Sequence, residues 1–303
     1  MHDLRKELLG ESLRIKTALM ERMYIPCVES GEFQYTPDQP FMIYSTPGAA
    51  DILHPRYREI CSMICTKPIF HRKQWEWVYI IHHLSKSGLV KACKRGIVFG
   101  VGREQLPSLF ASFGATIVCT DAPVAIGEKS GWNKTNQHSS NLDSLFYDNI
   151  VSKELFYSQV SFLSCDMTNI DSSLKEFDFT WSSCSLEHLG SLGAGVDFIV
   201  NSVENVLKIG GIACHTTELN LSSDEDTIEG NSDTVLYRRK DILSLIEMLR
   251  NRGHEVSPFL INPCTHYCDT HVDTPPYSHD IHLKLKLAGY VTTSVGLIIK
   301  RGR

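Results

Sequence analysis

Short apolar runs alternate with amphipathic stretches through most of the chain after residue 94, and this alternation limits the fold more than any other feature. The apolar runs are continuous, as in parallel strands that are buried on both faces of a sheet. Between them, apolar residues recur at helical spacing, as Leu106, Leu109 and Phe110 do. The pattern predicts an α/β fold with a doubly wound, mostly parallel sheet. Strands are predicted over 96–99, 116–120, 160–165, 177–181 and 212–217, and helices over 106–113, 196–207 and 239–251.

The end of the chain departs from this pattern. Leu283, Leu285 and Leu287 alternate with lysines, Ala288-Gly289 offers a turn, and residues 291–300 form another apolar run. So short a link joins antiparallel strands, because parallel neighbours need a longer crossover connection. The sequence therefore predicts that the last strand runs against the others.

Residues 1–93 carry helical patterns instead of strand runs. Helices are predicted over 3–23, 55–66 and 72–87, and prolines between 35 and 55 predict an irregular loop. We interpret 1–93 as a helical N-terminal cap region and 94–303 as the main domain. A lid-like insertion is expected near 261–282, where Pro275-Pro276 interrupts regular structure.

Composition and charge narrow the class of protein. The net charge is −5 and no long basic stripe is evident, which disfavours a nucleic acid as substrate. No window approaches the roughly 18 apolar residues of a membrane-spanning helix. The charged first residues do not resemble a signal peptide, and the ten cysteines are expected to be reduced, so a cytoplasmic location is expected.

Glycine and aspartate residues stand where the predicted strands end. Gly100 and Gly102 follow the first strand, where a missing Cβ lets the backbone approach a ligand. Asp121 ends the second strand, and there a carboxylate can accept both hydroxyls of a ribose. Asp166 ends the third strand and could accept a hydrogen bond from an adenine amino group. A nucleoside cofactor is therefore expected at this edge of the sheet.

Two cofactor classes fit such an edge, NAD and S-adenosylmethionine. The dinucleotide fingerprint requires a third glycine where Gln105 stands, and a pyrophosphate favours a helix start free of negative charge. Glu104 places a carboxylate in that turn. A carboxylate is tolerable near a sulfonium and an ammonium group, so the residues favour S-adenosylmethionine.

The successive motifs resemble those of class I S-adenosylmethionine-dependent methyltransferases, over roughly residues 95 to 300. They are Gly-Val-Gly-Arg-Glu at 100–104, Asp121, Asp166, the run at 177–182 and Leu-Lys-Ile-Gly-Gly at 207–211. The resemblance implies a seven-stranded sheet with a reversed last strand, a glycine loop around the methionine, Asp121 on the ribose and Asp166 near the adenine. The cofactor-binding residues expected are Gly100, Gly102, Arg103, Glu104, Asp121, Ala122, Asp166, Met167, Ser182 and Ser183.

This sequence departs from the family pattern at two positions. Val98 replaces the usual acidic residue, and Glu104 replaces the third glycine. Glu104 is therefore the candidate partner of the methionine ammonium. The stretches 181–190 and 215–220 also resemble uncharacterised bacterial methyltransferases associated with surface-polysaccharide synthesis, which favours a saccharide or other small hydroxylated acceptor.

The fourth and fifth strand ends carry the candidate catalytic residues. Methyl transfer to a hydroxyl requires a group that removes its proton. Glu187 and His188 follow the fourth strand, and His215 and Glu218 lie at the end of the fifth. His188 is the first candidate base and His215 the second, because histidine titrates near neutral pH. Glu187 could instead cap a turn, and His215 could be a buried structural histidine.

Other functions stay open on the sequence alone. Glu/His pairs at two strand ends could hold a divalent metal that assists transfer to a sugar hydroxyl. Cys264, His266, Cys268 and His271 crowd one loop, although their spacing matches no standard zinc motif. Trp132, Gln137 and His138 could fold over the adenine or the substrate. An NAD-type oxidoreductase and a non-catalytic binding protein with the methyltransferase fold are the remaining alternatives.

Overall fold

A computed structural model describes residues 8, 10–12, 40–123, 139, 141–230, 234–278 and 280–303. The helix predicted over 3–23 lies largely outside these ranges, and Trp132, Gln137 and His138 lie wholly outside them. None of the described helices has the length and apolar character needed to cross a bilayer.

The central sheet has the strand order β4-β3-β2-β5-β6-β10-β7. All neighbours from β4 to β6 are parallel, whereas β10 is antiparallel to both β6 and β7. The predicted doubly wound sheet with a reversed last strand is therefore confirmed. The strands are β2 (Arg95–Phe99), β3 (Thr116–Asp121), β4 (Val160–Ser164), β5 (Phe177–Ser183), β6 (Leu207–Asn220), β7 (Glu255–Val256) and β10 (Tyr290–Lys300), with β9 (Leu285–Leu287) paired to β10 as the predicted hairpin.

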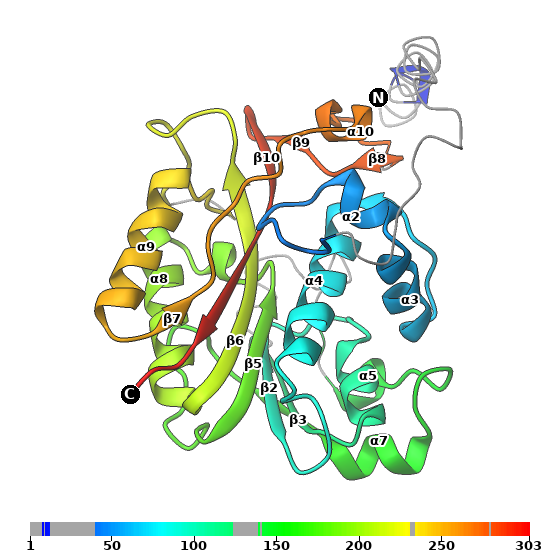
Figure 1. The fold of residues 1–303 in the computed structure, drawn as a ribbon, viewed down its shortest axis with the longest axis vertical. Coiled ribbons are helices and arrows are strands. Elements are labelled where there is room, and N and C mark those ends of the chain that lie inside the picture. The colour runs from blue at the N-terminus through cyan, green and yellow to red at the C-terminus, as the bar shows by residue number, and fades with distance from the viewer. Residues whose placement is uncertain are drawn as a thin grey trace.

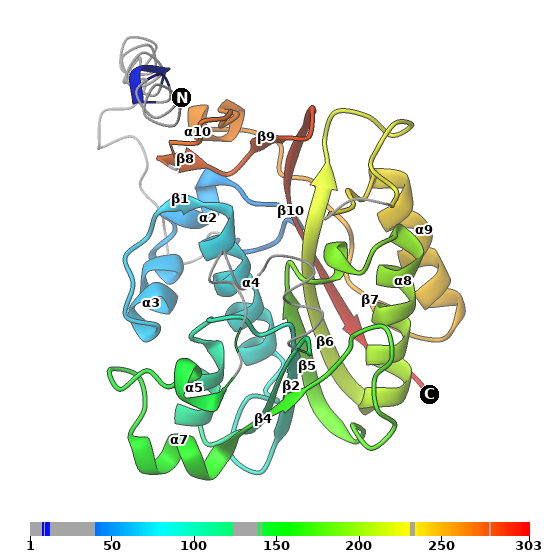
Figure 2. The same ribbon diagram turned by 180° about the vertical axis from the view of Figure 1, so that it is seen from behind.

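Helices cover both faces of this sheet (Figures 1 and 2). Successive strand residues point to opposite faces: Ile97 and Phe99 pack in the core under α8 and α9, and Val98 packs in the core under α4 and α5. Both faces are thus buried, as the continuous apolar runs require. One layer holds α8 (Leu192–Asn201), the π-helical turn η3 (Ser202–Val206) and α9 (Arg239–Asn251), and the other holds α4 (Arg72–Lys86), α5 (Leu106–Ser112) and α7 (Lys153–Gln159).

The cap region shares its core with the sheet. The ring of Tyr79 in α4 lies against Gly296 of β10, where an added Cβ would come within 2.3 Å of it. Around α4 pack α2 (Ala49–Leu53), which lies within the stretch predicted to be irregular, and α3 (Pro55–Met63). The region before residue 94 therefore contributes helices to one of the two helical layers, beside α5 and α7.

The segment after β7 lies beyond the carboxyl ends of the parallel strands. It contains α10 (Tyr267–Thr270) and β8 (Ile281–His282), and β8 pairs in parallel with β1 (Phe70–His71) of the cap. Figures 1 and 2 both draw α10 and β8 close to α2, and the Ala49 amide donates to Asp269 Oδ1 at 2.7 Å. Cap and insertion are thus joined at this edge of the sheet.

The helix predicted over 196–207 continues from α8 through the π-helical turn η3 to Val206, and β6 begins directly after it, at Leu207. Gly210 and Gly211, interpreted as a helix stop, lie within the strand near an irregularity in its pairing with β5. Gly210 has φ of 80°, and a Cβ on Gly211 would lie 2.9 Å from the Lys208 carbonyl oxygen. The two glycines therefore allow a distortion of the strand. In the sequence, a glycine pair at a strand distortion looks the same as one at a helix end.

Candidate active site

The loop after β2 is held by the carboxylate that ends β3. Gly100 and Gly102 have φ of 64° and 54°, a left-handed conformation that favours glycine. Asp121 Oδ2 accepts from the amides of Gly102 at 3.0 Å and Ser139 at 2.9 Å, and Oδ1 accepts from the Ala122 amide at 2.8 Å. Asp121 therefore joins the ends of two neighbouring strands, and it lies where the sequence predicted a cofactor-binding carboxylate.

The same loop touches the segment that follows β5. The Ser185 hydroxyl donates to the Gly100 carbonyl at 3.2 Å. A Cβ on Gly100 would lie 2.5 Å from Ser185 Oγ and 3.6 Å from the sulfur of Met167. Gly100 and Met167 are thus brought together, and the glycine has no room for a side chain.

The other predicted cofactor residues are distributed around this loop. Asp166 is half-buried, and its Oδ1 accepts from the Thr168 amide at 2.8 Å and hydroxyl at 2.7 Å. The Arg103 side chain is exposed, and its carbonyl accepts from the Tyr147 hydroxyl at 2.7 Å.

Glu104 is a buried carboxyl group. The Trp181 indole donates to its Oε1 at 2.5 Å, and no ion pair to Glu104 occurs among the described residues. Burial raises the pKa of Glu104 to about 8, although the Trp181 hydrogen bond opposes the rise. Glu104 thus links the glycine loop to β5, and a cation at this point would favour its charged form.

The structure places Ser182 and His215 in the core, which corrects two of the predicted roles. Both side chains are fully buried. Ser182 Oγ lies 2.8 Å from His215 Nδ1, and Ser202 Oγ lies 3.0 Å from Nε2. Burial lowers the pKa of His215 to about 3. His215 is therefore the neutral structural histidine that the sequence left open as an alternative, and Ser182 is its partner.

A cluster of buried charges lies at the ends of β5 and β6. Possible ligand atoms of Cys184, Glu187 and Glu218 all lie within 4.8 Å of one another, and all three residues are buried. The Thr217 hydroxyl donates to Glu187 Oε2 at 3.0 Å. The sequence predicted that Glu187 and Glu218 would meet, and the structure brings them together. His188, on the turn η2 (Leu186–His188), is half-buried beside them.

The cations of this cluster come from the start of α4, and the sequence did not indicate them. Arg72 Nη2 lies 2.5 Å from Glu218 Oε1 and Nη1 lies 3.5 Å from Glu76 Oε1, which is also 3.6 Å from Lys73 Nζ. Arg72 and Glu76 are one turn apart on α4, on either side of the fully buried Trp75. Two opposite charges one helical turn apart, beside a tryptophan, are the feature of the sequence that could have indicated a buried ion pair here.

Glu76 joins the cluster to three strands. Its carboxylate accepts from the hydroxyls of Ser183 and Thr216, each at 3.1 Å, and from that of Ser294 in β10. Burial would raise the pKa of Glu76, but Lys73 and Arg72, with the hydrogen bonds, hold it below its usual value. We call Arg72, Lys73, Glu76, Cys184, Glu187 and Glu218 the acceptor-edge cluster.

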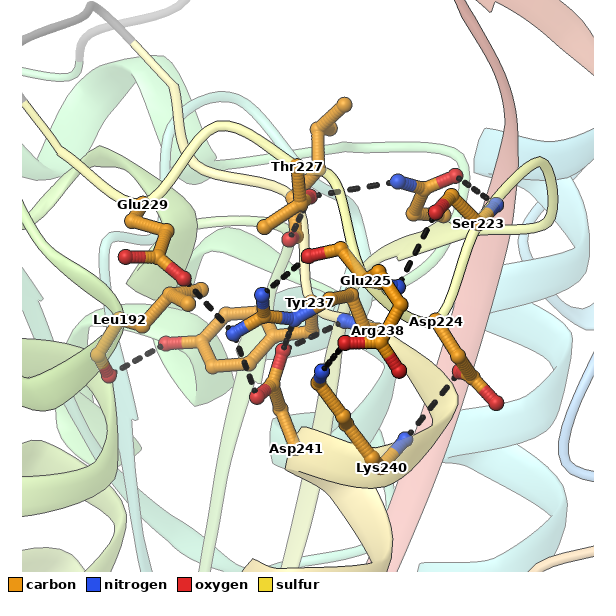
Figure 3. Close-up of polar contacts among 12 residues, drawn as sticks. Leu192, Ser223, Asp224, Glu225, Thr227, Glu229, Tyr237, Arg238, Lys240 and Asp241 are labelled. Atoms are coloured by element: carbon orange, nitrogen blue, oxygen red, sulfur yellow. Dashed lines mark hydrogen bonds and ion pairs between the residues drawn. The ribbon is translucent and has the colours of Figure 1, made fainter.

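The loop between β6 and α9 contacts the backbone beside this cluster, and Figure 3 shows the polar contacts within the loop. The Val235 amide donates to the Glu187 carbonyl at 2.9 Å. Arg238 fixes the loop, since it contacts the Glu225 carbonyl at 2.7 Å and the carboxylates of Glu229 and Asp241, each at 2.8 Å. Arg238 is therefore engaged inside the protein, whereas Arg239 is exposed and Lys240 pairs with Glu225 at the surface.

The four residues of the possible zinc motif do not converge. His266 Nδ1 accepts from the Cys268 amide, Cys268 is buried, and Cys264 Sγ lies 2.8 Å from Lys284 Nζ. Within the described part of the chain, the one group of side chains close enough to share a metal ion is Cys184, Glu187 and Glu218.

No protein-family model matches the sequence, and no curated protein matches it. Solved structures do match. The N-terminal domain of EvdMO1, crystallised with S-adenosylhomocysteine and D-fucose, is 13% identical over 73% of this chain and 81% of its own, with a TM-score of 0.43. A putative sarcosine dimethylglycine methyltransferase from Galdieria sulphuraria is 14% identical over 76% and 85%, with a TM-score of 0.41.

A third match is the magnesium protoporphyrin IX methyltransferase of Synechocystis PCC 6803 with bound S-adenosylhomocysteine. It is 12% identical, covers 76% of this chain and 83% of its own, and has a TM-score of 0.43. These values are too low to support an inference about activity. The fold is defined by the strand order of this chain itself.

Proposed function

We propose that this protein is an S-adenosylmethionine-dependent methyltransferase that transfers the methyl group to a hydroxyl of a saccharide or another small hydroxylated molecule. The observation that carries the proposal is the strand order, with β10 inserted antiparallel between β6 and β7. Dinucleotide-binding sheets have the order 3-2-1-4-5-6 and lack such a strand. The order therefore favours methyl transfer over the NAD-type alternative.

The cofactor would bind at the ends of β2, β3 and β4. Gly100 and Gly102 would let the backbone approach it, Asp121 would face the ribose, and Asp166 with Met167 would lie near the adenine. The fit is supported by the left-handed glycines and by the position of Asp121 between two strand ends. When bound, the cofactor supplies a methyl group activated by its sulfonium sulfur.

Glu104 is proposed to attract the methionine ammonium or to hold the loop that binds it. A buried carboxyl without a cationic partner would gain stabilisation of its charged form from a nearby ammonium. We expect Glu104→Gln to weaken S-adenosylmethionine and S-adenosylhomocysteine alike, since both carry the ammonium. Calorimetry that finds a loss for the sulfonium form alone would place the carboxylate at the sulfur instead.

The acceptor hydroxyl would lie at the acceptor-edge cluster, and Glu187, His188 and Glu218 are the candidates for removing its proton. His215 is left out because the core surrounds it. A metal-assisted route would use Cys184, Glu187 and Glu218. Arg72 already supplies a positive charge to Glu218 at 2.5 Å, which favours the route without a metal.

Two measurements test the proposal. In calorimetry, S-adenosylmethionine and not NAD should bind and raise the melting temperature. A screen with methyl-labelled cofactor against saccharides and small hydroxylated metabolites should then yield labelled product. Binding of NAD alone would refute the proposal, and cofactor binding without turnover on any acceptor would favour a non-catalytic binding protein. Loss of turnover with a chelator, restored by magnesium, would establish the metal route.

A further inference from the structure

Two polar atoms inside the acceptor-edge cluster lack a hydrogen-bond partner among the described residues. They are Arg72 Nε and Glu218 Oε2, and the side chains that carry them are 9% and 5% exposed. A buried polar group without a partner costs about 1–3 kcal/mol, and more when it is charged. Native structures rarely leave two such atoms together, so they call for a ligand or ordered water.

The two atoms flank the same ion pair. Arg72 Nη2 contacts Glu218 Oε1 at 2.5 Å, and Nε and Oε2 are the neighbouring atoms on the two rigid planar groups. A third unpartnered atom lies close by in the fold, Thr292 Oγ1. Thr292 is two residues before Ser294 in β10, hence on the same face, and Ser294 is opposite Glu218 in the sheet. This face of the acceptor-edge cluster therefore contains buried hydrogen-bonding groups that a polar ligand would satisfy.

We propose that the acceptor hydroxyl binds between Arg72 Nε and Glu218 Oε2, and that Glu218 removes its proton. This inference deepens the proposed function and rests on it. Arg72 donates a hydrogen bond to the hydroxyl oxygen, and the hydroxyl hydrogen points to Glu218. Arg72 is thus a catalytic residue, supplied by the cap region.

The chemistry of the two atoms selects the acceptor class. Arg72 Nε is a donor only, and an ionised Glu218 Oε2 is an acceptor only. A protonated amine has no lone pair for the arginine, and a carboxylate has no proton for the glutamate. A neutral hydroxyl satisfies both atoms at once. The site therefore takes an alcohol or phenol at this point in preference to an ammonium or an acid.

The proton transfer balances within the pair. As the acceptor oxygen forms its bond to the methyl carbon, the carbon–sulfur bond breaks and its electron pair stays on sulfur. The hydroxyl proton passes to Glu218 Oε2, and Arg72 stays protonated. Burial raises the pKa of Glu218, although Arg72 and Lys73 oppose the rise. A raised pKa makes this carboxylate a better proton acceptor than an exposed one.

The first test compares three probes with labelled cofactor: methyl β-D-glucopyranoside, glucosamine and glucuronate. We expect methyl ether formation on hydroxyls, with no labelling of the ammonium or carboxylate.

Glu218→Gln should lower kcat at least about 100-fold while the Kd of S-adenosylhomocysteine changes less than about twofold. Arg72→Lys keeps a charge but loses Nε and should raise KM about tenfold. Glu59→Gln is the control: it removes the ion pair between Arg56 and Glu59 on the surface of the cap, where the Glu59 side chain is 57% exposed. It should change neither kcat nor KM.

A crystal structure of the S-adenosylhomocysteine complex soaked in ethylene glycol needs no knowledge of the acceptor. An oxygen bonded to both Arg72 Nε and Glu218 Oε2 supports the proposal, and a side chain of this protein paired with either atom overturns it. If Glu218→Gln fails to fold, Glu218→Asp should fold and lose turnover, because its carboxylate is withdrawn by one methylene.

Three outcomes separate the failures. No cofactor binding in calorimetry refutes the proposed function itself. Cofactor binding with transfer to the amine of glucosamine keeps the methyltransferase and overturns the acceptor class. Near-normal kcat in Glu218→Gln, with a collapse in His188→Ala, assigns the proton to His188 and overturns the role of Glu218.

Discussion

The two edges of the candidate site are held together by different kinds of interaction. At the cofactor edge, one carboxylate, Asp121, accepts from three backbone amides and holds a glycine loop. At the acceptor edge, three buried carboxylates meet the buried Arg72 and the partly exposed Lys73, drawn from α4 and from the ends of β5 and β6. One edge thus depends on backbone geometry and the other on a balance of buried side-chain charge.

This difference determines how each edge responds to substitution. Backbone amides need a partner wherever they lie, so a single carboxylate at the cofactor edge satisfies groups that exist in any sequence. Buried charges stabilise a fold only as a complete set, because removal of one member leaves another uncompensated. We therefore expect changes at the acceptor edge to affect folding as well as chemistry, and changes at the Asp121 loop to affect chiefly the cofactor.

The largest effect is expected at Glu76. Glu76→Gln keeps the size of the side chain but removes the charge that faces Arg72 and Lys73. Removing one partner of a buried ion pair costs roughly 3–5 kcal/mol, and we expect a loss of that order in the free energy of unfolding. Urea denaturation with both circular dichroism and fluorescence measures it.

Glu247→Gln serves as the matched control, because Glu247 is exposed on α9. Its unfolding free energy should change by less than about 0.5 kcal/mol. An equally small change in Glu76→Gln would mean that solvent reaches Arg72, as it already reaches the partly exposed Lys73. The contrast between the two edges would then disappear.

The next effect concerns Glu104, the buried carboxyl group of the glycine loop, which forms no ion pair among the described residues. Burial raises the pKa of Glu104 to about 8 in the folded protein, from 4.5. Between these values the folded state binds more protons than the unfolded state, so its stability falls as pH rises. Glu104→Gln removes this slope. The variant should match the wild type near pH 4 and exceed its unfolding free energy by roughly 4 kcal/mol near pH 8.

Denaturation of both proteins across this pH range measures the difference between them. Parallel curves for wild type and Glu104→Gln would show that Glu104 is ionised in the folded protein. That result would mean a cation already lies beside it, and the two edges would be alike in containing paired buried charges.

The fold was predictable because its signals are local. Continuous apolar runs define strands such as β2 and β3, and the short Ala288-Gly289 link fixes the reversed β10. The start of β6 was missed because Gly210 and Gly211 occur at strand irregularities as well as at helix ends.

Of the site, the part that lies at strand ends was predictable. Gly100, Asp121, Glu187 and Glu218 each follow or end a strand, and parallel strands bring such residues to one edge. Arg72 was not predictable, because its place depends on how α4 docks on β6 and β10. A charged residue on a helix is usually solvated, and only the packing of the cap turns Arg72 inward.

A smaller effect is expected at Asp121, the residue on which the cofactor edge depends. Asp121→Ala removes the acceptor of three amides and of the proposed ribose hydroxyls. We expect the affinity for S-adenosylmethionine to fall at least about tenfold, or about 1.4 kcal/mol. Calorimetry on a variant of native circular dichroism measures it. Unchanged affinity would remove Asp121 from the site, whereas loss of the folded state would make this edge structural as well.

The smallest effect concerns the loop between β6 and α9, whose polar contacts Figure 3 shows. Arg238 is 11% exposed and joins Glu229 and Asp241, and the loop's Val235 amide reaches the Glu187 carbonyl. Arg238→Ala should cost about 1 kcal/mol of stability, because the pair with Glu229 is 64% exposed on the glutamate side and contributes little, which leaves mainly the pair with Asp241. It should lower turnover a few fold through a displaced Glu187, with cofactor affinity unchanged.

Hydrogen exchange distinguishes a local displacement of Glu187 from a general loss of stability. Protection should fall at the Val235 and Leu192 amides, whose acceptors are the carbonyls of Glu187 and Glu229, and should persist at the Gly102 amide bound to Asp121. Lys240→Ala loses only an exposed contact with Glu225, at 42% and 83% exposure, and should leave all three amides protected. Equal loss of protection at Gly102 in Arg238→Ala would mean that the two edges open together, so that the loop stabilises the whole site and does not act on Glu187 alone.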